Sequence, residues 1–429
     1  MHAFVCPECF LQTRPHALYF SRNKTWWSVS TEEASLYRNL CSHRTIWPSG
    51  TILGCDSMRV AIGRWLNADP AARVGDTSNA ASGAEEISIA TVAAARHTVE
   101  QRAEYPVAIS PVVGDSFRDP AARAAFQCNP GTAEIDGFDL RDVTLVAARL
   151  LLFHNGKRLK ETRYLVDDHD YWMIPPMPRA VHEPDGGKIV VIGANLAFRN
   201  YYHWLMQCLP ALDASVRIVG AANCVLALPP LSGWQEESLA LLGYANLPRI
   251  QIEFDCHYRI ARAHWNAYLG GAAEEYLSPR CLEVLDRAGA SVGPVPNTPE
   301  RIYVARLDSG NRVIRNEDAV RRLLEDHGFA MVIPGMLSFA AQIALFKGAR
   351  FVVGGHGAGL TNVAFCGPGT TVLELIQSTY PTVFMNRVAL AKGLRYHAEC
   401  FECVAGGDVN QRDWLVDIDQ LETKLVSIL

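Results

Sequence analysis

A glycine-rich loop contains the residues with the clearest capacity for chemistry. Gly354-Gly-His-Gly-Ala-Gly-Leu-Thr-Asn362 follows a predicted strand at 350–353 and precedes a predicted helix from about Ala358 to Phe365. Glycines let the backbone approach a ligand, and amides at a helix start attract anions, so the loop suits a phosphate or diphosphate. Tight strand-to-helix packing would also favour glycine, and His356 could contact a ligand or bond a neighbouring carbonyl. Both interpretations stay open on spacing alone.

Counting excludes two common nucleotide-binding loops. In G-x-G-x-x-G the third glycine would fall on Leu360 or on Asn362, depending on the frame, and neither residue fits. The chain contains no G-x-x-x-x-G-K-[ST]. An NAD-dependent oxidoreductase is therefore disfavoured, whereas a nucleotide diphosphate held by another loop remains open.

Three further residues are candidates for binding or proton transfer. Glu374 lies near the end of a predicted strand at 371–376, where its carboxylate could accept hydrogen bonds from ribose hydroxyls or simply be exposed. His203 lies at a predicted loop-to-helix junction and titrates near neutral pH, which makes it a candidate general base unless it is buried against a carbonyl. Asp213, ten residues later, is the reserve candidate and could instead be a surface residue.

Three patterns resemble metal sites but favour other interpretations. Asp-His-Asp at 168–170 mimics a metal-binding D-x-D motif, although a polar turn is the commoner meaning. Cys6-Pro-Glu-Cys9 and Cys400-Phe-Glu-Cys403 each have the spacing of half a zinc site. These halves lie much farther apart than the usual 15 to 20 residues. Unligated thiols are therefore favoured over a shared zinc ion or a disulfide or redox pair.

Composition indicates a folded protein of two or three domains. The 429 residues are 49% apolar and 20% charged, enough to build buried cores. Lys plus Arg is 40 against 45 for Asp plus Glu, a net charge of -5, which argues against a nucleic-acid partner. The sequence contains no run of 18 apolar residues, so no membrane span is predicted. Peripheral membrane association stays open. The start has no basic region before apolar residues, so we expect a cytoplasmic protein.

The chain contains two separate series of alternating predicted strands and helices, which predicts two doubly wound α/β domains. We expect an accessory region at 1–100, a first Rossmann-like domain at 101–292 and a second at 293–429, separated by the proline-rich stretch 293–299. Asn155-Gly156 predicts a hairpin turn in the first domain. The predicted strands are 188–193, 224–228, 250–254, 301–307, 329–333, 350–353, 371–376 and 396–404, and the predicted helices are 201–209 ending at Pro210, 234–242, one capped by Asn316, 338–346 capped by Ser338, 383–394 and 418–429.

Taken together, residues 188 to 405 resemble glycosyltransferase family 61. The matching pieces are Arg306 and Arg312 in a loop after a strand, Ile314-Arg-Asn-Glu317, Leu337-Ser-Phe with Gln342 and Phe346, His356-Gly-Ala-Gly-Leu-Thr-Asn362, Glu374, and Asn200-Tyr-Tyr-His-Trp-Leu205 with Leu209-Pro210. The family includes plant, eukaryotic protein-modifying and bacterial capsular or exopolysaccharide enzymes, and the last type is the one we expect.

The resemblance implies an inverting glycosyltransferase of the GT-B type, with two Rossmann-like domains facing a cleft. It implies transfer from a nucleotide diphosphate sugar, expected to be UDP-linked, to a glycan acceptor in polysaccharide biosynthesis, without metal or cofactor. His203 would be the base with Asp213 in reserve, and the donor would contact Arg306, Arg312, His356, Gly357, Ala358, Gly359, Leu360, Thr361, Asn362 and Glu374. The two arginines could instead lie on a solvated loop face. Gln207 stands where many relatives carry Glu, which leaves a non-catalytic binding relative as the alternative.

Overall fold

The structure is a computed structural model that describes residues 10–14, 17–22, 25–29, 85–105, 111–163, 178–183, 187–270, 276–293, 295, 298–404 and 411–429. The chain divides into two compact units, Met1–Gly75 and Asp76–Leu429. In the first unit, β1 (Phe10–Arg14), β2 (Ala17–Arg22) and β3 (Thr25–Val29) form an antiparallel meander. All the predicted site residues belong to the second unit.

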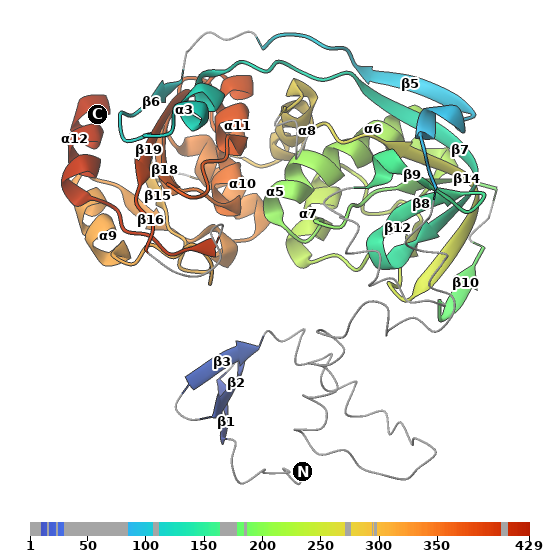
Figure 1. Ribbon diagram of the computed structural model, residues 1–429, viewed down its shortest axis with the longest axis horizontal. Coiled ribbons are helices and arrows are strands. Elements are labelled where there is room, and N and C mark those ends of the chain that lie inside the picture. The colour runs from blue at the N-terminus through green and yellow to red at the C-terminus, as the bar shows by residue number, and fades with distance from the viewer. Residues whose placement is uncertain are drawn as a thin grey trace. The chain divides into compact units, whose positions relative to one another are not determined.

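The C-terminal half of the second unit is built on a parallel sheet of order β16-β15-β17-β18-β19-β6. Its first five strands have the doubly wound order 2-1-3-4-5, and helices cover both faces (Figure 1). The predicted alternation is therefore confirmed here. The strands are β15 (Arg301–Val304), β16 (Ala330–Val332), β17 (Phe351–Gly355), β18 (Thr371–Gln377), β19 (Arg395–Phe401) and β6 (Val112–Val113), and the helices are α9 (Glu317–Asp326), α10 (Phe339–Gly348), α11 (Phe384–Lys392) and α12 (Ile418–Ile428).

The N-terminal half of the second unit is mixed, and the prediction of a doubly wound domain holds only for part of it. Strands β13-β12-β11-β14 are parallel in the order 3-2-1-4, but β14 then pairs with an antiparallel extension. Asn155 and Gly156 both have positive φ, as a two-residue hairpin turn requires, and they confirm the predicted turn. The strands are β4 (Glu86–Ile87), β5 (Ala95–Glu100), β7 (Ile135–Val146), β8 (Leu151–His154), β9 (Lys157–Leu159), β10 (Ala180–His182), β11 (Ile189–Ile192), β12 (Cys224–Leu228), β13 (Arg249–Gln251) and β14 (Cys256–Asn266), and the helices are α5 (Tyr201–His203), α6 (Leu209–Val219), α7 (Gly233–Leu241) and α8 (Pro279–Ala290).

A segment between the first strands of the N-terminal half crosses to the C-terminal half. β6 pairs in parallel with β19, and α3 (Pro120–Gln127) packs beside it (Figure 1). The prediction assigned residues 112–127 to the domain at 101–292, because two-residue β6 has no sequence pattern that would indicate its pairing with β19. Asn386 and Arg387 of α11 further donate hydrogen bonds to carbonyls at the end of α3. The crossing thus ties the two halves together.

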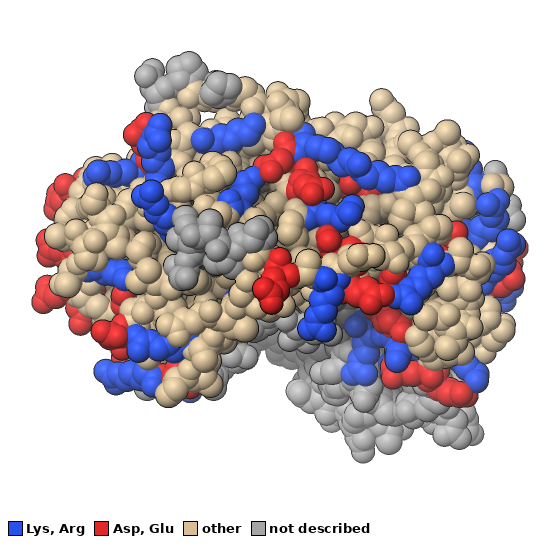
Figure 2. All heavy atoms as spheres, turned by 90° about the horizontal axis from the view of Figure 1, so that it is seen from above, with Lys and Arg blue, Asp and Glu red and all other residues tan. Residues whose placement is uncertain are grey.

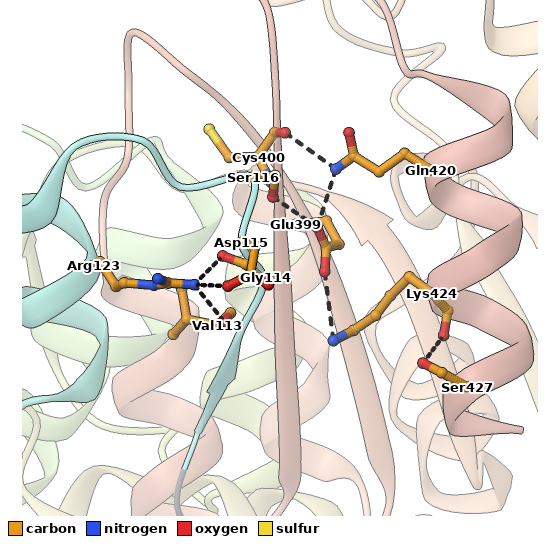
Figure 3. Close-up of polar contacts among 10 residues, drawn as sticks. All are labelled: Val113, Gly114, Asp115, Ser116, Arg123, Glu399, Cys400, Gln420, Lys424 and Ser427. Atoms are coloured by element: carbon orange, nitrogen blue, oxygen red, sulfur yellow. Dashed lines mark hydrogen bonds and ion pairs between the residues drawn. The ribbon is translucent and has the colours of Figure 1, made fainter.

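The crossing is held by the buried carboxylate of Glu399 on β19. Glu399 accepts hydrogen bonds from Ser116 at 2.6 Å and Gln420 at 3.0 Å, and it pairs with Lys424 of α12 at 3.4 Å (Figure 3). The carboxylate lies against Gly114, where any side chain would collide with it. One acidic side chain therefore joins the crossing segment, the sheet and the last helix.

Replacing Glu399 by Ala should lower the free energy of unfolding by about 3 kcal/mol, because it leaves the Lys424 ammonium buried without its partner. Urea denaturation measures the loss. Glu402→Ala is the matched control, since Glu402 pairs with Arg118 at the surface and should change stability by less than about 0.5 kcal/mol. Equal effects of the two substitutions would contradict this account.

The surface of the molecule carries charges of both signs. Figure 2 shows basic and acidic side chains interspersed over the described residues of the face it presents, in keeping with a net charge of -5. Among the described residues, no helix is both long and apolar enough to cross a membrane.

Candidate active site

The candidate site begins where the C-terminal sheet changes winding direction. In sheets of order 2-1-3-4-5, ligands bind outside the carboxyl ends of the strands at this switch point, which here lies between β15 and β17. Arg306 follows β15 and His356 follows β17. The guanidinium of Arg306 donates a hydrogen bond from Nη1 to the His356 carbonyl at 2.7 Å. The structure thus brings two of the predicted donor residues together.

Arg306 explains the glycine at position 357. Its guanidinium occupies the space that a Cβ at Gly357 would need, and Nη2 is held by Ser309 at 3.2 Å and the Asn311 carbonyl at 3.0 Å. Burial and the neighbouring Arg312 lower the pKa of Arg306 to about 10, so the side chain stays charged at neutral pH. The absence of a side chain at Gly357 therefore leaves room for the charged guanidinium of Arg306. Arg306 Nε is buried and has no hydrogen-bond partner among the described residues.

Arg312 adds a second cation held in a strained backbone. Its φ is +55°, a left-handed conformation that costs energy for a residue with a side chain. Its guanidinium lies 4.9 Å from the centre of the Tyr380 ring, and that ring stands 5.6 Å from His356. Burial lowers the pKa of Arg312 as well. Two guanidinium groups and an imidazole thus gather at one sheet edge, which is an environment for an anion.

The imidazole of His356 is fixed on both sides. Nδ1 lies 2.6 Å from Glu374 Oε1, and Nε2 lies 2.8 Å from the Thr382 hydroxyl. The other oxygen of Glu374 accepts a hydrogen bond from Tyr396. Glu374 is fully buried, and both of its oxygens contact side chains of the protein. Glu374 therefore positions His356, and its contact with ribose hydroxyls stays a prediction.

The predicted helix after His356 is confirmed. Residues Ala358–Phe365 form the helix η8, which is of the 3₁₀ type. Leu360, Thr361 and Asn362 are fully buried, and their role as donor contacts stays a prediction. Only Ala358 and Gly359 of this turn are partly exposed. These two residues are the part of η8 that is accessible to solvent.

On the other half, β11 leads into the helix that carries His203. The Asn200 side chain accepts hydrogen bonds from the amides of Tyr202 and His203 and so caps α5. Because β11 lies at the change of winding in the 3-2-1-4 order, this helix start also stands at a switch point.

The helix does not end at Pro210 as predicted, and the reason is a π-helical turn at Trp204–Cys208. Proline lacks the N–H that would bond the carbonyl four residues earlier. That carbonyl, on Met206, instead accepts from the Cys281 thiol at 3.2 Å, so the helix continues through α6. Single π turns in α-helices are frequent at functional sites, and this one carries Gln207.

Gln207 orients His203. Gln207 Oε1 accepts a hydrogen bond from His203 Nδ1 at 2.8 Å, and Asn195 donates to the same oxygen at 3.4 Å. The proton on Nδ1 leaves Nε2 as the basic nitrogen. Burial lowers the pKa of His203, and the bond to Gln207 opposes that shift. The residue that departs from the family pattern thus still orients the histidine, but as a neutral amide.

Changing Gln207 to Glu should move the acidic limb of the pH–rate profile about one unit upward. A carboxylate beside Nδ1 favours the imidazolium, which raises the pKa of His203 and removes the free base at lower pH. Steady-state rates between pH 5 and 9 would show the shift. Gln235→Glu, at a second buried glutamine, controls for the cost of burying a carboxylate. An unmoved profile would contradict the pairing.

Asp213, the reserve candidate, is engaged elsewhere. Its two oxygens bind Arg287 of α8, Arg217 at 3.0 Å and the Tyr244 hydroxyl. Burial raises the pKa of Asp213, and Tyr244 and Arg217 oppose that shift. These contacts give the side chain a structural role in joining α6 to α8, so we do not keep it as a base.

The two halves of the site meet directly. The Tyr201 hydroxyl of α5 donates to Asn362 Oδ1 of η8 at 2.7 Å, and Asn362 Nδ2 donates to Gln342 Oε1 at 2.8 Å. Glu237 of α7 accepts from the amides of Phe339 and Ala340 and so caps α10 from the other half. The helix that carries His203 is therefore docked on the turn that follows His356.

The D-x-D motif and the two cysteine pairs are not part of the candidate site described above. Residues 168–170, Cys6 and Cys9 lie outside the described residues. Cys400 and Cys403 are free thiols, and burial raises the pKa of Cys400 to about 12, which keeps that thiol protonated. Unligated thiols at the two cysteine pairs, in preference to a shared zinc ion, stay the prediction.

Comparison with known proteins points to the same segment. Residues 201–373 match the family model described as Glycosyltransferase 61. Over 62 residues the chain is 36% identical to a beta-1,2-xylosyltransferase of Arabidopsis thaliana, and also over 62 residues it is 37% identical to one of Oryza sativa subsp. japonica. Each match covers 14% of this chain and only 12% of the relative. The family match runs from the helix with His203 to the strand with Glu374, and these similarities support a glycosyltransferase.

Proposed function

We propose that this protein is an inverting glycosyltransferase that moves a sugar from a nucleotide diphosphate sugar to a hydroxyl of a glycan acceptor. The observation that carries the proposal is the docking of the His203 helix on the turn that follows His356, through Tyr201 and Asn362. This contact fixes a general base and a cationic anion site relative to each other. The proposal includes a GT-B type arrangement of the two halves and a role in polysaccharide synthesis.

The donor side supplies fixed positive charge. As the bond between the sugar and the diphosphate breaks, the diphosphate gains negative charge. Preorganised groups of the protein must stabilise that charge. Arg306 and Arg312 are held by the contacts described above, and the partly exposed backbone at Ala358 and Gly359 offers amides. Guanidinium groups can bind a phosphate through two parallel hydrogen bonds. The two arginines can therefore stabilise the leaving diphosphate in place of a metal ion.

The acceptor side supplies the base. The acceptor oxygen attacks the anomeric carbon from the face opposite the diphosphate, its proton passes to His203 Nε2, and the bonding pair of the broken C–O bond stays on the diphosphate oxygen. A single displacement of this kind inverts the anomeric configuration. The lowered pKa of His203 keeps the imidazole neutral and ready to accept the proton at neutral pH.

Thermal unfolding with a panel of nucleotide sugars, UDP-linked ones first, tests donor recognition. A ligand that binds only the folded state at 100 times its Kd adds about 2.7 kcal/mol of stability. The stabilising donor is then incubated with glycan acceptors, and NMR of the product reads its anomeric configuration. We expect inversion, release of one nucleotide diphosphate per transfer, and turnover that survives excess EDTA. Binding without release would show a non-catalytic relative, and retention would refute the single displacement.

A further inference from the structure

Two histidines and one aspartate converge on the antiparallel part of the N-terminal sheet. His97 of β5 and His264 of β14 flank Asp139 on the central strand β7. His97 Nε2 lies 3.0 Å from Asp139 Oδ2, and His264 Nδ1 lies 2.7 Å from Asp139 Oδ1. One candidate ligand atom from each residue lies within 4.8 Å of the other two. None of these residues takes part in the proposed transfer.

Gly137 creates the room for this cluster. It pairs with His97 on one side and with Asn266 on the other, in the same face as Asp139. A Cβ at Gly137 would stand 2.7 Å from Asn266 Oδ1 and 2.9 Å from His264 Nε2, closer than real side chains approach. The glycine therefore leaves room for the side chains of His264 and Asn266, and the His97 and His264 rings stand 5.7 Å apart between centres.

Hydrogen bonding alone leaves this cluster unsatisfied. His264 Nε2 and Asn266 Oδ1 are both buried without a partner, and both face Gly137. Asn266 Nδ2 donates to the Ala267 carbonyl at 2.7 Å, which fixes Oδ1 as the atom facing Gly137. If a proton on His264 Nδ1 makes the bond to Asp139, Nε2 is a buried acceptor without a donor, as Asn266 Oδ1 is. Two buried acceptors with no donor are unfavourable.

A cation in place of the Nδ1 proton resolves the mismatch. A metal-bound imidazole keeps its proton on the other nitrogen, so Nε2 becomes a donor on the side of the ring where the unpaired acceptor Asn266 Oδ1 lies. Histidine nitrogens that bind metals regularly have such an acceptor on the far side of the ring. The exposed parts of His97 and Asp139, 35% of each side chain, give an ion access from solvent.

We propose that His97 Nε2, His264 Nδ1 and the Asp139 carboxylate bind a divalent transition metal ion of the zinc type. Two imidazoles and a carboxylate are ligands that zinc favours, and three protein ligands leave one position for water. Ligands about 2.1 Å from a tetrahedral ion stand roughly 3.4 Å apart. His97 Nε2 and His264 Nδ1, now 3.0 Å and 2.7 Å from the Asp139 oxygens, would therefore each move away from Asp139 by less than about 1 Å. The ion fastens β5 to β7 and β14 and takes no part in sugar transfer.

Zinc titration of the full chain, stripped with EDTA and dialysed, tests this proposal. Calorimetry should show one zinc site on the wild type. Bound zinc should also raise the unfolding temperature of the wild type. His97→Ala and Asp139→Asn should each weaken zinc binding by about 100-fold or more, and Asn266→Leu, which removes only the acceptor for Nε2, by about 10- to 100-fold. His154→Ala, at an exposed histidine of β8, is the control and should leave affinity unchanged.

Cobalt(II) substitution separates this site from the cysteines of the chain. Nitrogen and oxygen ligands give no thiolate-to-metal charge-transfer absorption, whereas a site at Cys400 and Cys403 would. Unfolding in EDTA shows whether each variant still folds. Zinc affinity unchanged by His97→Ala and Asp139→Asn, or thiolate absorption in the stoichiometric cobalt complex, would overturn the proposal.

Discussion

His203→Ala should reduce turnover by about 10³-fold while donor binding, measured by calorimetry, stays within about twofold of wild type. In the proposed mechanism the imidazole takes the acceptor proton as the new glycosidic bond forms, and general bases contribute about 10²- to 10⁴-fold. In the same proposal the donor is held by Arg306 and Arg312 on the other half, and its binding does not depend on the base. The loss should therefore appear in kcat and not in donor affinity.

The matched control is His257→Ala, at a partly buried histidine of β14 whose pKa is also lowered by burial. It should leave turnover within about twofold. The pH profile gives a second readout, because the acidic limb set by His203 should disappear in His203→Ala. Near-normal turnover of His203→Ala would reject this residue as the base.

Arg306→Met should lower kcat by about 10²- to 10³-fold, as is typical when one donor to a developing negative charge is removed. Methionine keeps much of the apolar volume beside Gly357 but loses the charge and the hydrogen bond to the His356 carbonyl. Arg306→Lys keeps the charge without the planar fork and should recover part of the rate. Rates with saturating donor separate this effect from binding.

Arg301→Met is the control for Arg306→Met, because Arg301 begins the same strand and donates to the His327 carbonyl at the opposite sheet edge. It should leave kcat unchanged. Unfolding temperatures show whether the buried position tolerates the change. If Arg306→Met folds and turns over at the wild-type rate, the diphosphate does not rely on this cation.

Local sequence patterns predicted much of the fold because their signals are local. The run of apolar residues that forms β11, the strand β12 and the Ser338 cap of α10 are all confirmed. The Asn155-Gly156 turn followed from the positive φ that both positions need. Each of these depends on residues a few positions apart.

Features set by distant partners were missed. Asn316 was predicted to cap α9, but its side chain bonds both the amide and the carbonyl of Val416, a hundred residues away. Pro210 was predicted to end a helix that continues, because Cys281 supplies the donor that proline lacks. Neither partner is visible from the local pattern.

The candidate site was predicted only in part, because some of its residues follow local sequence patterns and others depend on distant partners. Arg306, His356 and His203 follow strands whose ends could be placed from sequence, so their convergence was accessible. Thr382 and Tyr380 were missed, although they follow β18, and examining every loop after a parallel strand would have found them. The burial of Glu374 and Asn362 depends on Tyr396 and Tyr201, which only the folded chain brings near.

A crystal structure of the protein with a nucleoside diphosphate and an acceptor glycan tests the central claim most directly. We expect the diphosphate oxygens within hydrogen-bond distance of the Arg306 or Arg312 guanidinium and of the backbone amides at Ala358 and Gly359. The acceptor hydroxyl should lie within about 3 Å of His203 Nε2. A diphosphate bound away from this turn, or an acceptor hydroxyl out of reach of His203, would contradict the account.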